Sequence, residues 1–259
     1  MLFRSVFDRV GRSAILAVGI TFSGMVLGGS RFVLSSSMKW TGFDIRRMFE
    51  EASSLPVFVE NNSRLKAVWY AYANRQKGNV LFVDLHKGIG AVQVCDGAVN
   101  PYVLGEIGHT TVEKDGESCF CGNSGCLEAM CSLRRLKNLY KEYSGKENVS
   151  ESEIARLYLL GDPFAVSAAD NCAMYLGIGL ANLVSLLNPE TIVINTGDFK
   201  NCLPVIDTAV EQMKSRVHLS LVESVSVQLI SVSDENIVCG GAIDMCDRIF
   251  DPESPYNPV

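Results

Sequence analysis

The sequence has few positive charges for its length. Its 23 lysines and arginines are outnumbered by 29 aspartates and glutamates, and the net charge is −6. Nucleic-acid-binding surfaces are marked by basic patches and a high isoelectric point, whereas the isoelectric point here is about 5.2. We therefore expect no nucleic acid to bind to this chain alone. The sequence also has no internal repeat and no low-complexity segment.

No apolar run has both the length and the purity of a membrane span. The run 14–27 follows several arginines, as in a secretory signal, but Thr21 and Ser23 interrupt it and its first part is typical of a buried strand. The run 165–187 contains Asp170 and is predicted to be a buried helix. The nine cysteines, an odd number, favour a reducing compartment over a disulfide scaffold. Together these features predict a cytoplasmic protein with no membrane partner.

Strand-like and helix-like patterns alternate along the chain. The predicted strands are 15–20, 56–60, 80–84, 91–95, 191–195 and 225–231, with an extended segment at 32–39. The predicted helices, besides 165–187, are 1–12, 40–51, 63–73, 133–143, 151–160, 203–216 and 241–249, and 251–259 reads as a loose tail. This alternation predicts an α/β fold with a largely parallel sheet.

One stretch, residues 105–128, concentrates the metal-binding side chains. It contains one of the three histidines and three of the nine cysteines: His109, Cys119, Cys121 and Cys126. Imidazole and thiolate are preferred ligands of Zn²⁺, and a structural zinc site is closed by four of them. Glycine- and asparagine-containing turns between them allow the chain to fold back on itself. The spacing therefore predicts a structural zinc site; the alternative is a set of reduced, partly buried thiols without metal.

The same stretch carries a resemblance. Glu106-x-Gly-His109, followed by Cys-x-Cys-Gly-x-x-Gly-Cys-Leu-Glu128, resembles the signature of the ROK family of repressors, open reading frames and kinases. Weaker resemblance extends from Ile15 to Asp247. The chain looks most like the sugar-binding region of the family's transcriptional regulators, of the N-acetylglucosamine and xylose repressor type.

The resemblance implies an actin-like (ribonuclease H-like) sugar-kinase fold with two lobes. Residues 1–95 would be the remainder of the first lobe, and residues 96–259 the second lobe, with the zinc loop and the C-terminal helices. The family's first strand carries an Asp-x-Gly-x-Thr phosphate loop. This sequence has no such motif, so the first lobe is expected to be truncated at its N-terminus.

The resemblance also implies a site that has lost its catalytic groups. The family's kinases carry the catalytic base as the Asp of a Glu-Asn-Asp-Ala motif, and the matching position here is Asn62. An amide cannot accept a proton at neutral pH, although it still forms hydrogen bonds. Of the family's Gly-Thr-Gly-x-Gly phosphate loop only Gly88 and Gly90 remain, because His86 and Lys87 replace the first two residues. A second glycine position carries Asp198, a poor neighbour for phosphate.

The sugar-binding side is better preserved. By correspondence with the family, Glu106 and Glu128 would take sugar hydroxyls at the anomeric end, and Asn61 and Asn62 at the far end. His109 would link the sugar pocket to the zinc. From the residues alone, the Asn61-Asn62 pair could equally be a helix N-cap.

Three functions are therefore open. The first is a non-catalytic sugar-binding domain of a ROK-type regulator, with a structural zinc and without need of ATP or Mg²⁺. The second is an ATP-dependent hexose or N-acetylhexosamine kinase, and the third is a zinc-stabilised scaffold that binds no sugar. The expected partners are a monosaccharide or sugar phosphate and further copies of the chain, as a homodimer or tetramer.

Overall fold

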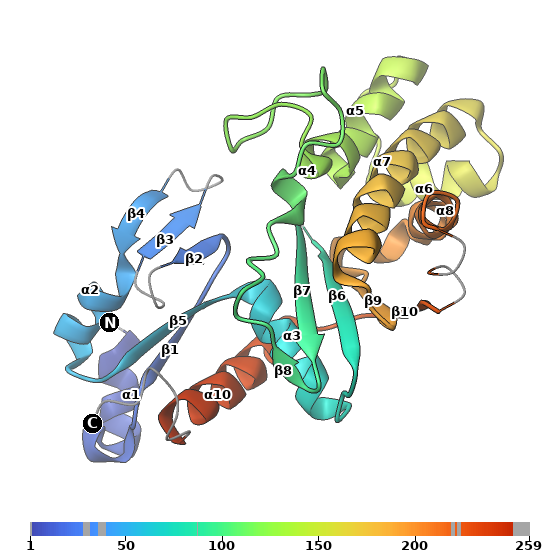
Figure 1. Ribbon diagram of the computed structural model, residues 1–259. Coiled ribbons are helices and arrows are strands. Elements are labelled where there is room, and N and C mark those ends of the chain that lie inside the picture. The colour runs from blue at the N-terminus through green and yellow to red at the C-terminus, as the bar shows by residue number, and fades with distance from the viewer. Residues whose placement is uncertain are drawn as a thin grey trace. The chain divides into compact units, whose positions relative to one another are not determined.

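The computed structural model describes residues 2–27, 32–35, 40–86, 88–218, 221 and 224–250 (Figure 1). The chain divides into two compact units, residues 1–76 with 233–259 and residues 77–232. This division differs from the boundary at residue 95 expected from the sequence. The last helix packs in the first unit, and periodicity does not reveal which earlier element a late helix will contact.

The first unit contains two small sheets. In one, β1 (Val18–Phe22) and β5 (Val57–Asn61) pair in parallel; in the other, β2 (Met25–Leu27), β3 (Phe32–Ser35) and β4 (Trp40–Asp44) are antiparallel. The helices of this unit are α1 (Leu2–Val10), η1 (Arg12–Ala14), α2 (Ile45–Ser53), α3 (Asn62–Ala73) and α10 (Asp234–Phe250). The predicted strands at 15–20 and 56–60 are thus found, each shifted by a few residues.

The core of this unit forms between the parallel strands and the helices. Phe22, Ile45, Val57 and Val59 make its buried cluster. Helix α10 packs on α3 and on β1. At Gly240 the approach is so close that an added Cβ would lie 2.0 Å from the backbone oxygen of Leu65. Only a glycine allows these two helices to come so near.

Two predicted helices have different starting points in the structure. Residues 40–44, predicted as helix, form strand β4 because they pair with β3; α2 starts only after Asp44, whose carboxylate accepts a hydrogen bond from the Arg47 amide (3.0 Å). Aromatic residues such as Trp40 and Phe43 favour a strand over a helix. The final helix starts at Asp234, seven residues before the predicted start at residue 241. The expected extended residues 36–39 and the tail 251–259 lie outside the described residues.

The second unit is built on one five-stranded sheet, in the order β10–β9–β6–β7–β8. The strands are β6 (Asn79–Leu85), β7 (Ile89–Cys95), β8 (Ala98–Val99), β9 (Thr191–Asn195) and β10 (Ser226–Ile230). Strand β9 is parallel to β6 and β10, whereas β7 is antiparallel to both neighbours. The expectation of a largely parallel sheet is therefore wrong: the sheet is mixed, because the short β6–β7 turn forces a hairpin.

Helices complete this unit. Those whose bounds the structure describes are η2 (Ile107–His109), α4 (Leu127–Cys131), α5 (Leu133–Ser144), α6 (Glu151–Leu159), α7 (Pro163–Leu187), η3 (Gly197–Asn201) and α8 (Leu203–Lys214). Helix α7 is long and apolar enough to cross a membrane by length and composition alone, but 61% of its most apolar 18-residue window is buried inside the structure. It packs on α5 and α8, so the prediction of a buried helix is confirmed. Its alanines and glycines allow this close packing, as at Gly177 against Ala209.

Candidate functional site

The predicted metal loop is folded by its own backbone. His109 ends the short helix η2, and Cys126 directly precedes helix α4. Thr111 and Cys126 form an antiparallel bridge, and the Leu127 amide donates to the Thr110 oxygen (2.9 Å). A second bridge, between Ser118 and Ser124, brings Cys119 and Cys121 back towards Cys126. Backbone hydrogen bonds alone therefore hold the two ends of the loop together.

One glycine in the loop is required by space as well as by conformation. Gly125 has φ of +66°, and an added Cβ would lie 1.6 Å from the backbone oxygen of Glu113. The left-handed backbone and the lack of a side chain let the Gly125 carbonyl accept hydrogen bonds from the amides of Val112 (2.8 Å) and Glu113 (3.2 Å). This turn sets the direction in which Cys126 enters the cluster.

The structure brings all four predicted ligands together. Their ligand atoms lie within 4.8 Å of one another. Cys119 Sγ is 3.5 Å from His109 Nδ1, and Cys121 Sγ is 3.6 Å from Cys126 Sγ. A tetrahedral zinc ion bound to sulfur and nitrogen requires ligand–ligand separations of about 3.6–3.8 Å. The donor set and its spacing therefore fit one tetrahedral Zn²⁺.

The surroundings of the cluster differ from one thiol to the next. Cys126 is fully buried and its Sγ lies 3.5 Å from the His109 carbonyl oxygen, whereas Cys121 is exposed. Burial raises the pKa of the Cys126 thiol to about 12. Without a metal this thiol is protonated at neutral pH, so binding of a metal would release its proton.

Two carboxylates border the cluster. Glu106 Oε2 lies 3.9 Å from His109 Nε2. Burial raises the pKa of Glu106, opposed by His109 and reinforced by Glu128. Glu128 Oε2 accepts a hydrogen bond from the Ile89 amide (3.3 Å) and would lie 2.7 Å from a Cβ added at Gly88. Both predicted hydroxyl acceptors are therefore held next to the loop, and Glu128 is also tied to the β6–β7 turn.

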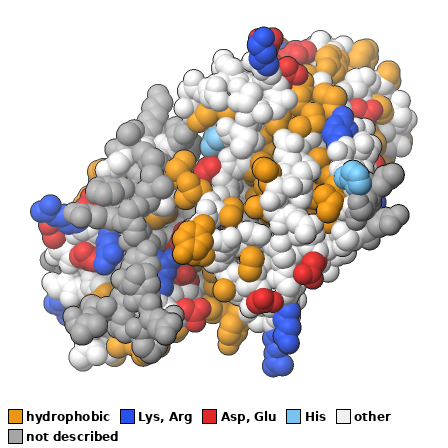
Figure 2. Space-filling model, in the orientation of Figure 1, with side chains coloured by type: hydrophobic (Ala, Val, Ile, Leu, Met, Phe, Trp, Pro, Cys, Tyr) orange, Lys and Arg blue, Asp and Glu red, His pale blue; other side chains and the backbone are white. Residues whose placement is uncertain are grey.

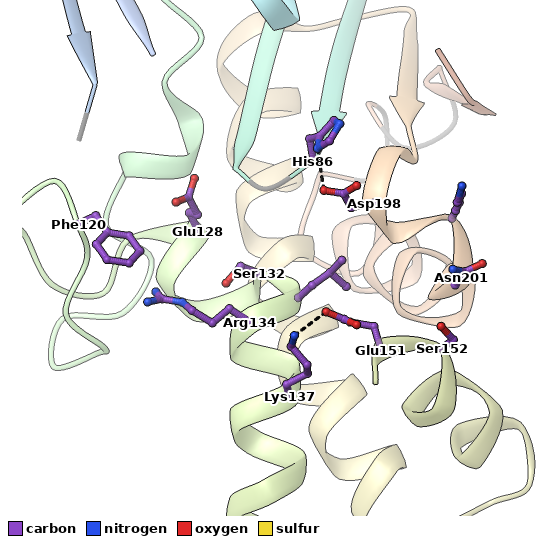
Figure 3. Close-up of a pocket in the computed structure, with 12 residues that line it drawn as sticks. His86, Phe120, Glu128, Ser132, Arg134, Lys137, Glu151, Ser152, Asp198 and Asn201 are labelled. Carbon is purple, nitrogen blue, oxygen red and sulfur yellow. Dashed lines mark ion pairs between the residues drawn. The ribbon is translucent and has the colours of Figure 1, made fainter. Parts of the chain in front are cut away.

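A pocket of about 500 Å³ opens beside Glu128 within the second unit. Its lining residues are His86, Phe120, Glu128, Ser132, Leu133, Arg134, Lys137, Glu151, Ser152, Asp198, Lys200 and Asn201. In Figure 3, Phe120, Glu128 and Arg134 lie at one end and His86 and Asp198 at the other. Sequence reasoning had singled out His86, Glu128 and Asp198 but missed the others. The position of Phe120 between two cysteines was the one available signal.

The predicted remnant of a phosphate loop is closed by its own contacts. His86 Nδ1 pairs with Asp198 Oδ2 at 2.7 Å. The His86 amide donates to the Gly88 oxygen, and Gly90 lies within strand β7, paired with Asp84. The Ile89 amide is taken by Glu128. The backbone amides of His86 and Ile89 and the His86 side chain therefore already have hydrogen-bonding partners within the protein. Lys87 lies outside the described residues.

The asparagine pair of the first unit has a local structural role. Asn61 caps α3, because its Oδ1 accepts from the amides of Ser63 (2.8 Å) and Arg64 (3.3 Å), and its Nδ2 donates to the Gly24 oxygen (2.7 Å). Asn62 Oδ1 accepts a hydrogen bond from Thr21 Oγ1. For Asn61, these hydrogen bonds match the helix N-cap interpretation. Contact of Asn61 and Asn62 with sugar stays a prediction.

Residues 5–247 match the family described as the ROK family. The chain belongs to the ROK family. The resemblance inferred from the motif around His109 is thereby confirmed over almost the whole chain.

Relatives in this family include both regulators and enzymes. The xylose repressor of Bacillus subtilis is 27% identical over 243 residues, covering 92% of this chain and 62% of the repressor. The glucokinase of Halalkalibacterium halodurans is 31% identical over 208 residues, covering 72% of this chain and 62% of the enzyme. This ROK chain thus spans about three fifths of the length of these relatives.

Solved structures confirm the fold. The ROK hexokinase from Thermus thermophilus matches with a TM-score of 0.75 and 28% identity, covering 92% of this chain and 82% of the hexokinase. A ROK family transcriptional regulator, a homologue of the Escherichia coli MLC protein, matches with a TM-score of 0.77 and 24% identity, covering 93% and 65%. The chain therefore has the actin-like α/β fold of the ROK sugar kinases, as predicted.

Proposed function

We propose that this ROK chain is a non-catalytic sugar-binding domain of a transcriptional regulator or a regulator-like protein. The observation that carries the proposal is the pair between His86 and Asp198 (2.7 Å), which fills the remnant of the phosphate loop while Glu106 and Glu128 keep acceptors for sugar hydroxyls. The similarity to xylose repressors supports this function. A ROK glucokinase in complex with glucose and AMPPNP has the same fold.

Zinc has a structural role in this proposal. His109, Cys119, Cys121 and Cys126 would hold one Zn²⁺, and four protein ligands leave no open position for catalysis. The ion would fix the loop on which Glu106 precedes His109 by three residues and Glu128 follows Cys126 by two. The positions of the four metal-binding side chains would then determine the positions of the Glu106 and Glu128 carboxylates.

The absence of catalysis follows from the groups present. Phosphoryl transfer to a sugar hydroxyl requires a base for the hydroxyl proton and positive or neutral surroundings for the phosphates. Asn62 occupies the base position of the family motif, and Asp198 adds a negative charge on the phosphate side. ATP and Mg²⁺ are therefore outside the proposal. A cytoplasmic location and assembly as a dimer or tetramer stay predictions.

A sugar kinase is the second candidate, favoured by the similarity to a glucokinase. The deciding experiment measures ATP consumption by the purified chain with xylose, glucose, N-acetylglucosamine and N-acetylmannosamine, in the presence of Zn²⁺ and Mg²⁺. We expect no turnover in protein that retains its zinc. Turnover on any of these sugars would replace our proposal with the kinase.

Thermal shift with the same sugars separates a sensor from a scaffold that binds no sugar. A sugar at 100 times its Kd stabilises the folded state by about 2.7 kcal/mol, which raises the melting temperature. We expect one sugar to do so, and Glu106→Ala to abolish the shift while the zinc content is unchanged. No shift with any sugar, in metal-loaded protein, would contradict the sensor function.

A further inference from the structure

The sheet of the second unit has two edge strands, and they differ in how well they are protected. Edge strands usually avoid pairing with other chains by being very short or by containing proline or charged residues. Strand β8 has only two residues. Strand β10 (Figure 1) has five, and within the described part of the chain it pairs with β9 alone. Its sequence, Ser-Val-Gln-Leu-Ile, contains neither proline nor a charged residue, so this edge is open to a further strand.

The open backbone groups of this edge belong to Val227 and Leu229. In a parallel pair, alternate residues direct their N–H and C=O groups to the same neighbouring strand. The Ser226 amide donates to the Glu190 oxygen (3.0 Å), so residues 226, 228 and 230 face β9. The N–H and C=O groups of Val227 and Leu229 therefore point away from β9. The backbone of an extended segment matches such a row of donors and acceptors.

A groove of about 460 Å³ lies beside this edge, between β10 and helix α8. We call it the edge groove. Its apolar lining consists of Val210 from α8 and of Val227 and Leu229 from β10, whose side chains share one face of the strand. Leu229 is 42% exposed in the edge groove. A strand added to β10 would cover this side chain and place its own apolar side chains beside it.

The rim of the edge groove has an excess of negative charge. Asp207 and Glu211 line it from α8, and Lys214 Nζ pairs with Glu211 Oε1 (2.9 Å). Asp207 has no ion pair with any residue that the structure describes. A second copy of this chain, with its net charge of −6, would bring more negative charge to the edge. A segment with a lysine or arginine would instead complement Asp207.

We propose that β10 binds an extended segment of a partner protein, with alternating apolar residues and a lysine or arginine. The segment adds a strand to the sheet: its backbone pairs with Val227 and Leu229, its apolar side chains enter the edge groove, and its basic side chain pairs with Asp207. This interaction surface goes beyond the sugar-binding function, because it shares no residue with the metal cluster or with the pocket beside Glu128.

The test measures the binding of synthetic peptides to the whole chain by isothermal titration calorimetry. The probe is acetyl-Thr-Val-Thr-Val-Thr-Lys-Thr-amide, which presents its valines and its lysine on one face when extended. The matched peptide has glutamate in place of lysine. We expect the lysine peptide to bind about fivefold more tightly in dilute salt, as for one partly exposed ion pair. The difference should shrink in about 0.5 M NaCl, because salt screens the charge.

Two changes test the backbone pairing. Leu229→Pro removes an outward N–H group but none of the hydrogen bonds to β9, and proline is tolerated on edge strands. We expect it to abolish peptide binding, whereas the control Leu229→Thr keeps the N–H group and should still bind. Zinc content and melting temperature check the folding of both variants. N-methylation of the peptide makes the same test on wild-type protein: methyl groups on one set of alternate amides should abolish binding, and those on the other set should not.

A third variant tests the charge. We expect Asp207→Asn to remove the preference for the lysine peptide. Asp170→Asn, an exposed change on α7 outside the edge groove, is the matched control and should retain the preference.

Four results would contradict the proposal. Absence of binding by both peptides would overturn it and leave the sugar-binding function standing. Binding that survives Leu229→Pro and both methylation patterns would exclude pairing with the edge. A lysine preference that survives Asp207→Asn would exclude the proposed basic contact. Self-association of the wild type that Leu229→Pro abolishes, measured by sedimentation velocity, would assign the edge to a second copy of the chain.

Discussion

His86 Nδ1 lies 2.7 Å from Asp198 Oδ2. The pair joins the β6–β7 turn to helix η3. By the family resemblance, both positions are expected to carry glycine in a phosphate-binding kinase. We therefore infer that the two departures act as one structural change, in which each side chain supplies the hydrogen-bonding partner of the other.

Restoring the catalytic base alone should not create a kinase. We expect Asn62→Asp to show no ATP-dependent phosphorylation of glucose or N-acetylglucosamine, because His86 and Asp198 still close the phosphate side. The measurement is coupled ADP release, with zinc content and melting temperature as checks on folding. The matched comparison is the variant that also carries His86→Gly and Asp198→Gly. Turnover by Asn62→Asp alone would show that the His86–Asp198 pair does not block phosphate.

Metal removal should destabilise the second unit. We expect about one zinc per chain in freshly purified, untagged protein, measured by mass spectrometry, and a lower melting temperature after chelation, because loop and metal fold together. Cys126→Ser should lose the metal. Cys95→Ser, which changes an exposed cysteine outside the cluster, should retain it. Wild-type protein without zinc would contradict the structural metal site.

Two glycines of the loop should respond differently to a methyl group. Gly122 has φ of +93° with no atom within 4 Å of an added Cβ, whereas Gly125 has φ of +66° and meets the Glu113 oxygen at 1.6 Å. We expect Gly122→Ala to lower the free energy of unfolding by about 1 kcal/mol from backbone strain alone. Gly125→Ala should lower it by about 3 kcal/mol or more, with loss of zinc. Equal effects in urea denaturation would show that the contact at Gly125 relaxes.

The first unit should lose stability as the pH rises from 5 to 7.5. Burial raises the pKa of Asp244 to about 6, against the opposing effect of Arg248. In the unfolded chain an aspartate titrates near 3.9, so the folded state binds the proton more tightly. The stabilisation that protonated Asp244 gives the folded state is therefore complete below the unfolded pKa of about 3.9. It is lost as the pH rises through about 6. We expect a decrease of about 1 kcal/mol over this interval.

Tryptophan fluorescence can measure this effect, because both tryptophans, Trp40 and Trp69, belong to the first unit. Asp244→Asn should flatten the pH dependence. Asp247→Asn, an exposed change on the same helix, should leave it as in the wild type. A pH dependence unchanged by Asp244→Asn would assign it to another group.

The distribution of lysines and arginines on the surface is consistent with the small number of these residues in the sequence. On the face in Figure 2, the described lysines and arginines lie singly or beside acidic side chains, and they do not gather into a patch.

The sequence predicted local structure and the clustering of His109 with three cysteines better than it predicted the pairing of distant elements. Strands such as β6 and β9 are short apolar runs with clear ends. His109 and the three cysteines are close in sequence, so turns alone could bring them together. Strand β4 was missed because residues 40–51 were predicted as one helix, whereas the helix begins only after Asp44.

The pocket itself could not be predicted from a pattern. Phe120 and Arg134 are separated by fourteen positions in the chain and meet only because α5 packs beside the loop. The same holds for His86, which follows β6, and Asp198, which lies in η3. Contacts of this kind depend on tertiary packing, for which periodicity and propensity contain no information.

The return of α10 to the first unit also sets an order for synthesis. Residues 77–232 leave the ribosome as one continuous segment and contain the whole five-stranded sheet, so the second unit can fold first. Strand β1 and helix α3 are made before residues 77–232, yet α10, which packs on both, is made after them. The first unit is therefore completed only after the second, and a nascent chain arrested before Gly240 would carry the whole segment 77–232 while the first unit still lacked its last helix.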